Sequence, residues 1–135
     1  MILGEADFRR MLAWEVQRAT RYQDFLSLFL VRLARPLAPL TILRELVARK
    51  LVELLRSSDV VGIVGDDLAV ILVHTPDTDA LGITERLQPA LRDFALSEST
   101  GGEVTLQLSL VAFPGDATSD DALLARALAR LPRLS

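Results

Sequence analysis

Two short apolar runs, residues 60–64 and 68–73, constrain this chain most, because only Gly65, Asp66 and Asp67 separate them. Both runs are rich in valine and isoleucine, which favour strands. Glycine and aspartate between two such runs are typical of the turn of a β-hairpin. The pattern therefore predicts two antiparallel strands with two adjacent carboxylates at the tip of their turn.

The carboxylates at this tip have a chemical and a structural interpretation. Adjacent carboxylates at a tight turn are ligands for a hard cation such as Mg²⁺, together with the phosphates that it carries. Glycine and aspartate are also simply good turn formers, and the turn alone favours that interpretation. Arg56 and Asp59 add a charged pair just ahead of the first strand.

Composition limits the class of protein. At 135 residues, half of them apolar, the chain is expected to form a single domain over residues 1–135 with a substantial core. The formal net charge of −3 gives no general attraction for nucleic acid or anionic lipid. Cysteine is absent from the sequence, which excludes disulfides and thiolate metal sites.

A membrane segment is not expected. The most apolar stretch, residues 25–33, is too short to cross a bilayer and contains Arg32. Charged residues such as Glu5, Asp7 and Arg9 interrupt the N-terminus, unlike the apolar core of a signal peptide. We therefore expect a cytoplasmic location without membrane insertion.

The remaining periodicities predict four helices and two further strands. Pro89 is expected to kink or shorten the third helix. An Asp77/Thr78 cap is expected to start that helix, and Ser119 is expected to cap the last helix. Trp14 lies off the apolar stripe of the first helix, so it is expected to cover a neighbouring element or a partner. The predicted helices are residues 8–23, 40–55, 77–94 and from 119 onward, and the predicted strands are residues 25–34 and 103–113.

The second and last of these elements carry two further expectations. Arg44, Glu45, Arg49 and Glu53 are expected to face water on the second helix. Leu106 and Leu108 are expected to be buried in a central strand, because apolar and polar residues alternate there.

The predicted order of elements is α-β-α-β-β-α-β-α. It contains the β-α-β-β-α-β core of the ferredoxin-like arrangement, with an antiparallel sheet and additional N- and C-terminal helices. The expected class is therefore α+β. This fold hosts many unrelated functions, so it does not identify one.

Five segments, in order along the chain, carry motifs that together resemble one family. They are Phe8 with Glu15, Arg18, Ala19, Arg21, Tyr22, Ser27 and Leu28; residues 55–59, LRSSD; residues 64–72, VGDDLAVIL; Glu85-Arg86-Leu87; and residues 108–114, LSLVAFP, followed by residues 121–124, DALL. In these motifs the chain resembles a GGDEF domain, the diguanylate cyclase fold, over nearly its whole length. The resemblance implies a nucleotidyl-cyclase-like sheet.

The chain departs from the family at its metal and guanine sites. Active members carry a Mg²⁺-binding aspartate in the first strand, whereas Arg32 and Ala34 occupy the matching positions here. A guanidinium there would repel the metal. The family's guanine-reading insert is missing, and only residues 36–39 bridge the strand and the next helix.

The signature turn is also degenerate. Its residues are Val64, Gly65, Asp66, Asp67 and Leu68 if Val64 replaces the first glycine, and the interval from Asp59 is then one residue short. If Gly65 is placed first instead, Leu68 takes the position of the catalytic carboxylate. Either placement implies a degenerate GGDEF domain that is not an enzyme, with no catalytic residues, no metal and no cofactor.

One feature of the family is retained. In many members an RxxD pair and an arginine on the next helix bind cyclic di-GMP at an inhibitory site, and Arg56, Asp59 and Arg86 match these positions. The structural alternative is a salt bridge at the helix exit and a solvated Glu85/Arg86 pair. His74, the only histidine, is expected at the surface.

Two functions are therefore expected. The first is a non-catalytic signalling module, in which cyclic di-GMP held by Arg56, Asp59 and Arg86 regulates another protein or a neighbouring domain. The alternative is an interaction or homodimerisation domain without a nucleotide ligand.

Overall fold

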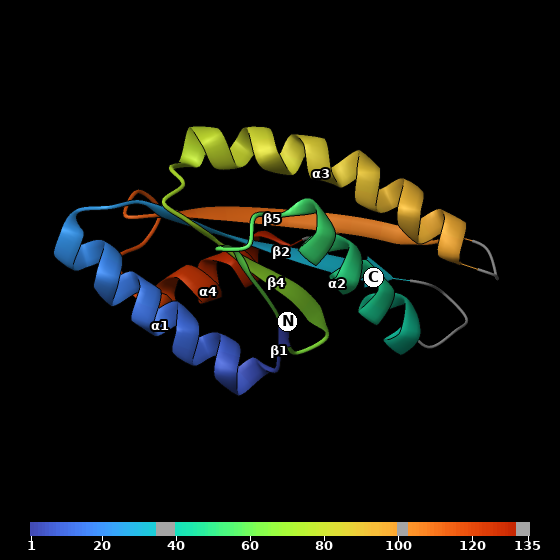
Figure 1. Cartoon of the computed structure of the whole chain (residues 1–135), viewed down its shortest axis with the longest axis horizontal. Helices are drawn as coiled ribbons and strands as arrows, with labels where there is room; N and C mark the ends of the chain where they lie inside the picture. Colours follow the sequence, from blue (N-terminus) through green and yellow to red (C-terminus); the bar gives the residue numbers. More distant parts are fainter. Residues whose placement is uncertain (35–39, 100–102, 132–135) are drawn as a thin grey trace.

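The computed structural model describes residues 1–34, 40–99 and 103–131. Helices and strands follow one another in nearly the predicted order (Figure 1). The elements are β1 (Ile2–Leu3), α1 (Glu5–Tyr22), β2 (Leu26–Ala34), α2 (Thr41–Leu54), β3 (Val60–Val64), β4 (Asp67–Val73), α3 (Asp77–Glu98), β5 (Thr105–Phe113) and α4 (Asp120–Arg130). In the described part of the chain, no helix has the length and apolar character needed to cross a membrane.

The sheet has the order β1-β3-β4-β2-β5. Within the run β3, β4, β2 and β5, each strand pairs antiparallel with the next, which confirms the α+β class and the antiparallel core. The short strand β1 pairs parallel with β3, so the complete sheet is mixed. The sequence patterns did not predict β1, because two residues are too few to show an alternation.

The hairpin of β3 and β4 is confirmed, with a tighter turn than predicted. Val64 pairs with Asp67, so Gly65 and Asp66 alone form the turn and β4 begins one residue earlier than expected. Gly65 has a φ of 59°, a left-handed conformation that favours glycine. Leu68 is fully buried in β4.

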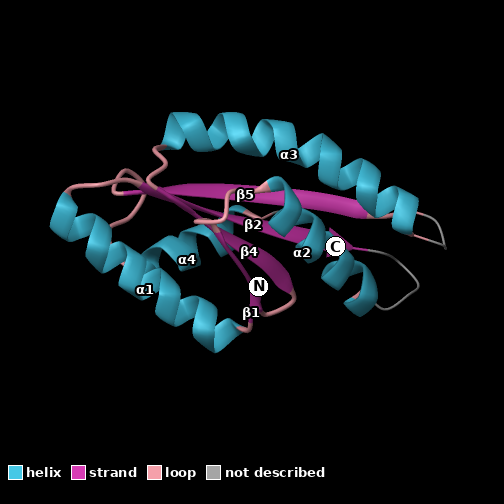
Figure 2. Ribbon diagram, viewed as in Figure 1, coloured by secondary structure: helices cyan, strands magenta, loops and turns pink. Residues whose placement is uncertain are grey.

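Helices cover both faces of the sheet (Figure 2). Helices α1 and α4 pack on one face, to which Leu28 and Leu30 of β2 point. Helices α2 and α3 pack on the other face, to which Phe29 and Val31 of the same strand point. Because successive strand residues face opposite sides, β2 is buried on both sides, as its continuous apolar run predicted.

Strand β5 differs from the prediction because it forms an edge of the sheet. Leu106 is buried, whereas Leu108 is only half-buried against the cluster formed with α2 and α3. Alternation shows which residues share a face, but it does not show where a strand lies in the sheet order.

Helix α3 continues through Pro89 for 22 residues, so of the kink or shortening expected at Pro89 the shortening is wrong. Pro89 is exposed, opposite the buried residues Thr84, Leu87 and Leu91, so water can reach the carbonyl that loses its hydrogen bond. The expected Asp77/Thr78 cap is also wrong, because Pro76 is the N-cap residue. The Ser119 cap is confirmed, since its Oγ accepts a hydrogen bond from the Ala122 amide at 3.1 Å.

Candidate functional site

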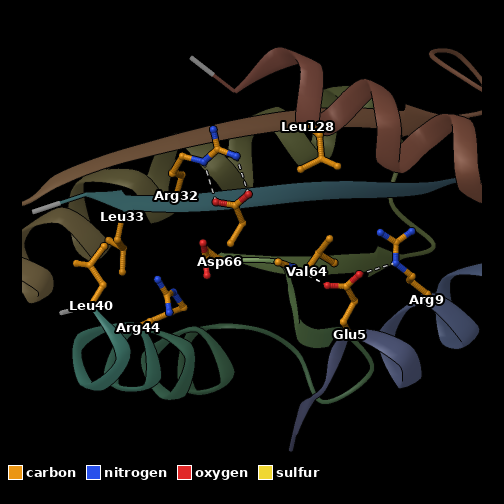
Figure 3. Close-up of a pocket in the computed structure, with 11 residues that line it drawn as sticks. Glu5, Arg9, Arg32, Leu33, Leu40, Arg44, Val64, Asp66 and Leu128 are labelled. Carbon is orange, nitrogen blue, oxygen red and sulfur yellow. Dashed lines mark hydrogen bonds and ion pairs between the residues drawn. The ribbon is translucent and has the colours of Figure 1, made fainter. Parts of the chain in front are cut away.

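A cleft of about 540 Å³ lies beside the tip of the β3–β4 hairpin (Figure 3). Its walls come from the start of α1, the end of β2, the start of α2, the hairpin and α4. Polar side chains gather there: the arginines Arg9, Arg32 and Arg44 and the carboxylates Glu5, Asp66 and Asp67. The signature turn and the metal-strand position predicted from sequence therefore lie in one cleft.

Arg32 and Asp67 form a two-pronged ion pair within this cleft (Figure 3). Arg32 Nε donates to Asp67 Oδ1 at 2.8 Å, and Arg32 Nη2 donates to Asp67 Oδ2, also at 2.8 Å. The Asp67 side chain is only 5% exposed and that of Arg32 is 25% exposed. The hydrogen bonds to Asp67 raise the pKa of Arg32 above its ordinary value, so the pair stays charged on the arginine side.

The strand register explains this pairing. Strands β2 and β4 are antiparallel neighbours in which Val31 pairs with Leu68. Arg32 and Asp67 come next on their strands, so they lie side by side although 35 positions separate them in sequence.

The carboxylate of Asp67 at the tip is engaged by an arginine. Magnesium needs several oxygen ligands, and both oxygens of Asp67 already accept hydrogen bonds from Arg32. Within residues 1–34, 40–99 and 103–131, no three histidine or acidic side chains are grouped so that they could hold a metal ion.

Two further contacts at the tip were not found by sequence reasoning. Glu5 Oε1 accepts a hydrogen bond from the Gly65 amide at 2.6 Å, and Glu5 Oε2 accepts one from Arg9 Nε at 3.0 Å. The Gly65 amide, followed by Arg9, lowers the pKa of Glu5. The bond to Gly65 ties the start of α1 to the turn, and no local pattern indicates a contact across 60 positions.

The expectation that Arg44 faces water is wrong. Arg44 is half-buried and lines the cleft instead of facing water, and its Nε is buried without a hydrogen-bond partner in the described residues. Figure 3 shows its side chain rising from α2 toward the side of the cleft where Asp66 lies. A helical wheel could not show this, because the hairpin on the other side of the cleft lies elsewhere in the sequence.

The RxxD pair forms a closed local network. Asp59, whose side chain is 2% exposed, accepts hydrogen bonds from the Arg56 amide at 3.0 Å and from Arg56 Nη2 at 3.3 Å. Arg56 Nη2 also donates to the Val73 carbonyl at 3.0 Å and to Thr75 Oγ1 at 2.8 Å. The pair therefore links the exit of α2 to the end of β4.

Arg86 lies apart from this network. It is exposed on α3, and its Nε donates to the Gly82 carbonyl at 3.3 Å in the same helix. No hydrogen bond or ion pair in the described part of the chain joins it to Arg56 or Asp59. Helices α2 and α3, which precede Arg56 and carry Arg86, cover the same face of the sheet and contact each other.

A second polar network lies at the other end of α1. Arg18 donates to Glu15 Oε1 at 3.0 Å and to Asp24 Oδ2 at 2.9 Å, and the same Asp24 oxygen contacts His74 Nδ1. The side chain of His74 is 63% exposed, in agreement with the expected surface position. Burial raises the pKa of Asp24, but hydrogen bonds from Arg18, the Phe25 amide and His74 outweigh it and hold the pKa below its usual value.

This lowered pKa predicts a sensitivity to acid. A carboxyl group with a lower pKa in the folded state stabilises the protein above its unfolded-state pKa, and this stability is lost as the pH falls through the folded-state pKa. We expect the free energy of unfolding to fall more steeply below about pH 4 in the original protein than in an Asp24→Asn variant. Urea unfolding at a series of pH values measures both slopes, and parallel curves would contradict the prediction.

No protein-family model matches this sequence, and no curated protein matches it. Solved structures do match its fold. A DGC protein from Thermotoga maritima has a TM-score of 0.77 at 17% identity, with 98% of this chain and 97% of that chain covered. The GGDEF domain of DgcB from Caulobacter crescentus, solved in complex with c-di-GMP, has a TM-score of 0.74 at 16% identity and coverages of 95% and 80%.

A third match is to a diguanylate cyclase that was solved with a protein partner. SiaD from Pseudomonas aeruginosa, in complex with its activator SiaC, has a TM-score of 0.61 at 19% identity, with 95% of this chain and 56% of that chain covered. Together these likenesses show that the chain has the fold of GGDEF diguanylate cyclase domains across nearly its whole length.

Proposed function

We propose that this chain is a non-catalytic signalling module with a GGDEF fold. The observation that carries the proposal is the ion pair of Arg32 and Asp67 at the hairpin tip. In the family that the chain resembles, the first strand supplies a metal-binding aspartate at this place. Here the strand supplies Arg32, whose guanidinium is hydrogen-bonded to the carboxylate of Asp67.

The replacement of a metal-binding aspartate by an arginine matters for phosphoryl transfer, which needs bound metal ions. The protein contributes positioning and charge stabilisation, and the metal ions neutralise the phosphates of the nucleotide. A guanidinium bound to both oxygens of Asp67 competes with a metal for that carboxylate, and its own charge opposes a cation nearby.

The first experiment tests for catalysis. Purified protein incubated with Mg²⁺ and GTP is expected to form no cyclic di-GMP, as measured by chromatography beside an active diguanylate cyclase. Product that appears with the original protein and disappears in an Asp66→Ala variant would overturn the proposal.

We further propose that the module is a receptor for cyclic di-GMP, bound by Arg56 and Arg86. Both side chains are exposed, and guanidiniums bind phosphate and stack on bases. The DgcB domain was solved with this ligand on the same fold. Asp59 accepts hydrogen bonds from the amide and the guanidinium of Arg56, so its role in this proposal is to hold Arg56 in place, or to reach guanine after its network opens.

Calorimetric titration with cyclic di-GMP tests this site. Arg86→Ala is the cleaner variant, because the hydrogen bond that Arg86 forms among the described residues lies within its own helix. It is expected to weaken binding by ~1.5–3 kcal/mol, the usual loss for a hydrogen bond to a charged group. Arg92→Ala, an exposed arginine on the same helix, is the matched control. Equal weakening by both variants would indicate diffuse charge attraction instead of a site.

The second candidate is an interaction domain without a nucleotide ligand. It is favoured by the exposed apolar residues on α1, where Trp14 is 61% exposed. A relative of the same fold was solved with a protein activator. Absence of heat at high micromolar cyclic di-GMP would reject the receptor and leave this candidate.

A further inference from the structure

Arg44 differs from the other arginines that line the cleft beside the hairpin tip. Arg9 is paired with Glu5, and Arg32 is paired with Asp67. Arg44 forms no ion pair with any residue in the described ranges, and its Nε is buried without a hydrogen-bond partner there. A buried donor without an acceptor is costly, so native proteins rarely keep one. The free Nε therefore indicates an acceptor that comes from outside the chain.

The cleft itself shows which acceptor suits such a donor. Arg32 uses its Nε and one Nη to hold both oxygens of the Asp67 carboxylate. Arg44 has the same planar edge, and this edge matches a carboxylate in two-pronged geometry. Arg44 also borders a smaller hollow, but the acidic residue that lines it, Glu45, is already paired with Arg49. The acceptor that Arg44 lacks is therefore a carboxylate on the cleft side.

A free carboxylate and an apolar wall lie near this donor. Asp66 is exposed in the hairpin turn and accepts no hydrogen bond from the described residues. Figure 3 shows Arg44 and Asp66 on the same side of the cleft, with Leu33 and Leu40 beside Arg44. No ion pair joins Arg44 to Asp66 in the structure. This side of the cleft therefore offers one cation, one anion and an apolar surface.

The charges of the cleft oppose a phosphate ligand. Glu5, Asp66 and Asp67 all line it, and three carboxylates repel a group that carries several negative charges. A zwitterion avoids this repulsion, because it brings an anion for Arg44 and a cation for Asp66 together. Free amino acids carry both charges at one end of the molecule and a side chain at the other. The cleft volume of about 540 Å³ has room for such a molecule.

We propose that this side of the cleft binds a free amino acid with an apolar side chain. Its carboxylate is held by Arg44 and its ammonium group by Asp66, and its side chain packs against Leu33 and Leu40. The site uses neither Arg56 nor Arg86, so the proposal is independent of whether cyclic di-GMP binds. It requires neither a metal ion nor catalysis.

The first part of the experiment compares three ligands by calorimetric titration into the full chain. Leucine is the zwitterionic probe, isocaproate is leucine without its ammonium group, and isopentylamine is leucine without its carboxylate. Leucine is expected to bind with a stoichiometry of one. Each of the other two is expected to bind at least about tenfold more weakly, because one charge of the site is left without a partner.

Variants then assign the two charges. Arg44→Met is expected to weaken leucine binding at least about tenfold, whereas Arg49→Met, which removes an exposed arginine of the same helix, leaves it unchanged. Asp66→Asn is expected to weaken leucine binding without weakening that of isocaproate, since isocaproate has no ammonium group to lose a partner.

The melting temperature of the free protein is a second readout. Arg44→Met removes a buried donor that has no acceptor in the described residues, so this variant is expected to melt at a higher temperature than the original protein. Loss of leucine binding in a more stable protein cannot be attributed to unfolding. A lower melting temperature would mean that Arg44 has its partner within the chain, and it would overturn the proposal.

Three further outcomes would also overturn it. Absence of leucine binding at millimolar concentration would show that the cleft is not an amino-acid site. Isocaproate binding as tightly as leucine would remove the role of Asp66 and reject the zwitterion. Inorganic phosphate displacing leucine at similar concentration would indicate a general anion site instead.

Discussion

Replacing Arg32 with methionine is expected to lower the free energy of unfolding by ~3–5 kcal/mol at neutral pH. The variant keeps most of the side-chain length but leaves the Asp67 carboxylate, which is 5% exposed, without either of its hydrogen bonds from Arg32. An unpaired buried charge is costly because the protein interior solvates it poorly. Urea denaturation followed by circular dichroism measures the loss, and the 25% exposure of Arg32 places it toward the lower end of the range.

Two further variants make this result specific. Arg49→Met removes the same charge from a pair with Glu45 whose side chains are 65% and 57% exposed, and it is expected to cost at most ~1 kcal/mol. Arg32→Met combined with Asp67→Leu removes both charges and is expected to recover most of the stability. Similar losses in Arg32→Met and Arg49→Met would mean that the cleft pair is not effectively buried.

Replacing Gly62 with alanine is expected to lower the free energy of unfolding by ~1–3 kcal/mol, the usual cost of overpacking. A Cβ at this position of β3 would lie 2.6 Å from Phe8 Cδ2, 2.9 Å from Phe8 Cβ and 3.0 Å from the Leu3 carbonyl oxygen. Phe8 belongs to α1 and is fully buried, so it cannot move aside without disturbing that helix. Thermal and urea unfolding measure the change.

Gly82→Ala is the matched control, with an effect of opposite sign. Gly82 lies within α3, and a Cβ there would meet no other atom within 4 Å. Alanine in a helix is expected to stabilise the protein by ~0.5–1 kcal/mol relative to glycine. If Gly62→Ala behaved in the same way, the close approach of α1 to the sheet would have to be wrong.

Local patterns were sufficient to predict most of the fold. The hairpin follows from two β-branched runs around Gly65 and Asp66, and the continuous run in residues 25–34 predicted a strand covered on both faces. The RxxD pair could be anticipated as a contact at a helix exit, because Arg56 and Asp59 are three positions apart. These features depend on neighbours along the chain, which a sequence shows directly.

The candidate site was predictable only in part. The sequence placed an arginine where a metal ligand would be expected, and it placed two aspartates at a turn. Three features depend on residues far apart in sequence. Arg32 binds Asp67, Glu5 accepts a hydrogen bond from the Gly65 amide, and Arg44 lines the cleft. Such contacts arise from strand order and register, which alternation within a single strand does not encode.

The sequence by itself therefore determined the type and order of the main elements, since hydrophobic periodicity and turn chemistry are local properties. The tertiary structure decided that β1 joins the sheet, that β5 lies at its edge and that Trp14 stays uncovered. It also decided that Arg32 of β2 forms an ion pair with Asp67 at the hairpin tip. The physical reason is that pairing between strands and packing of helices on the sheet bring together residues tens of positions apart, and burial then makes those contacts strong.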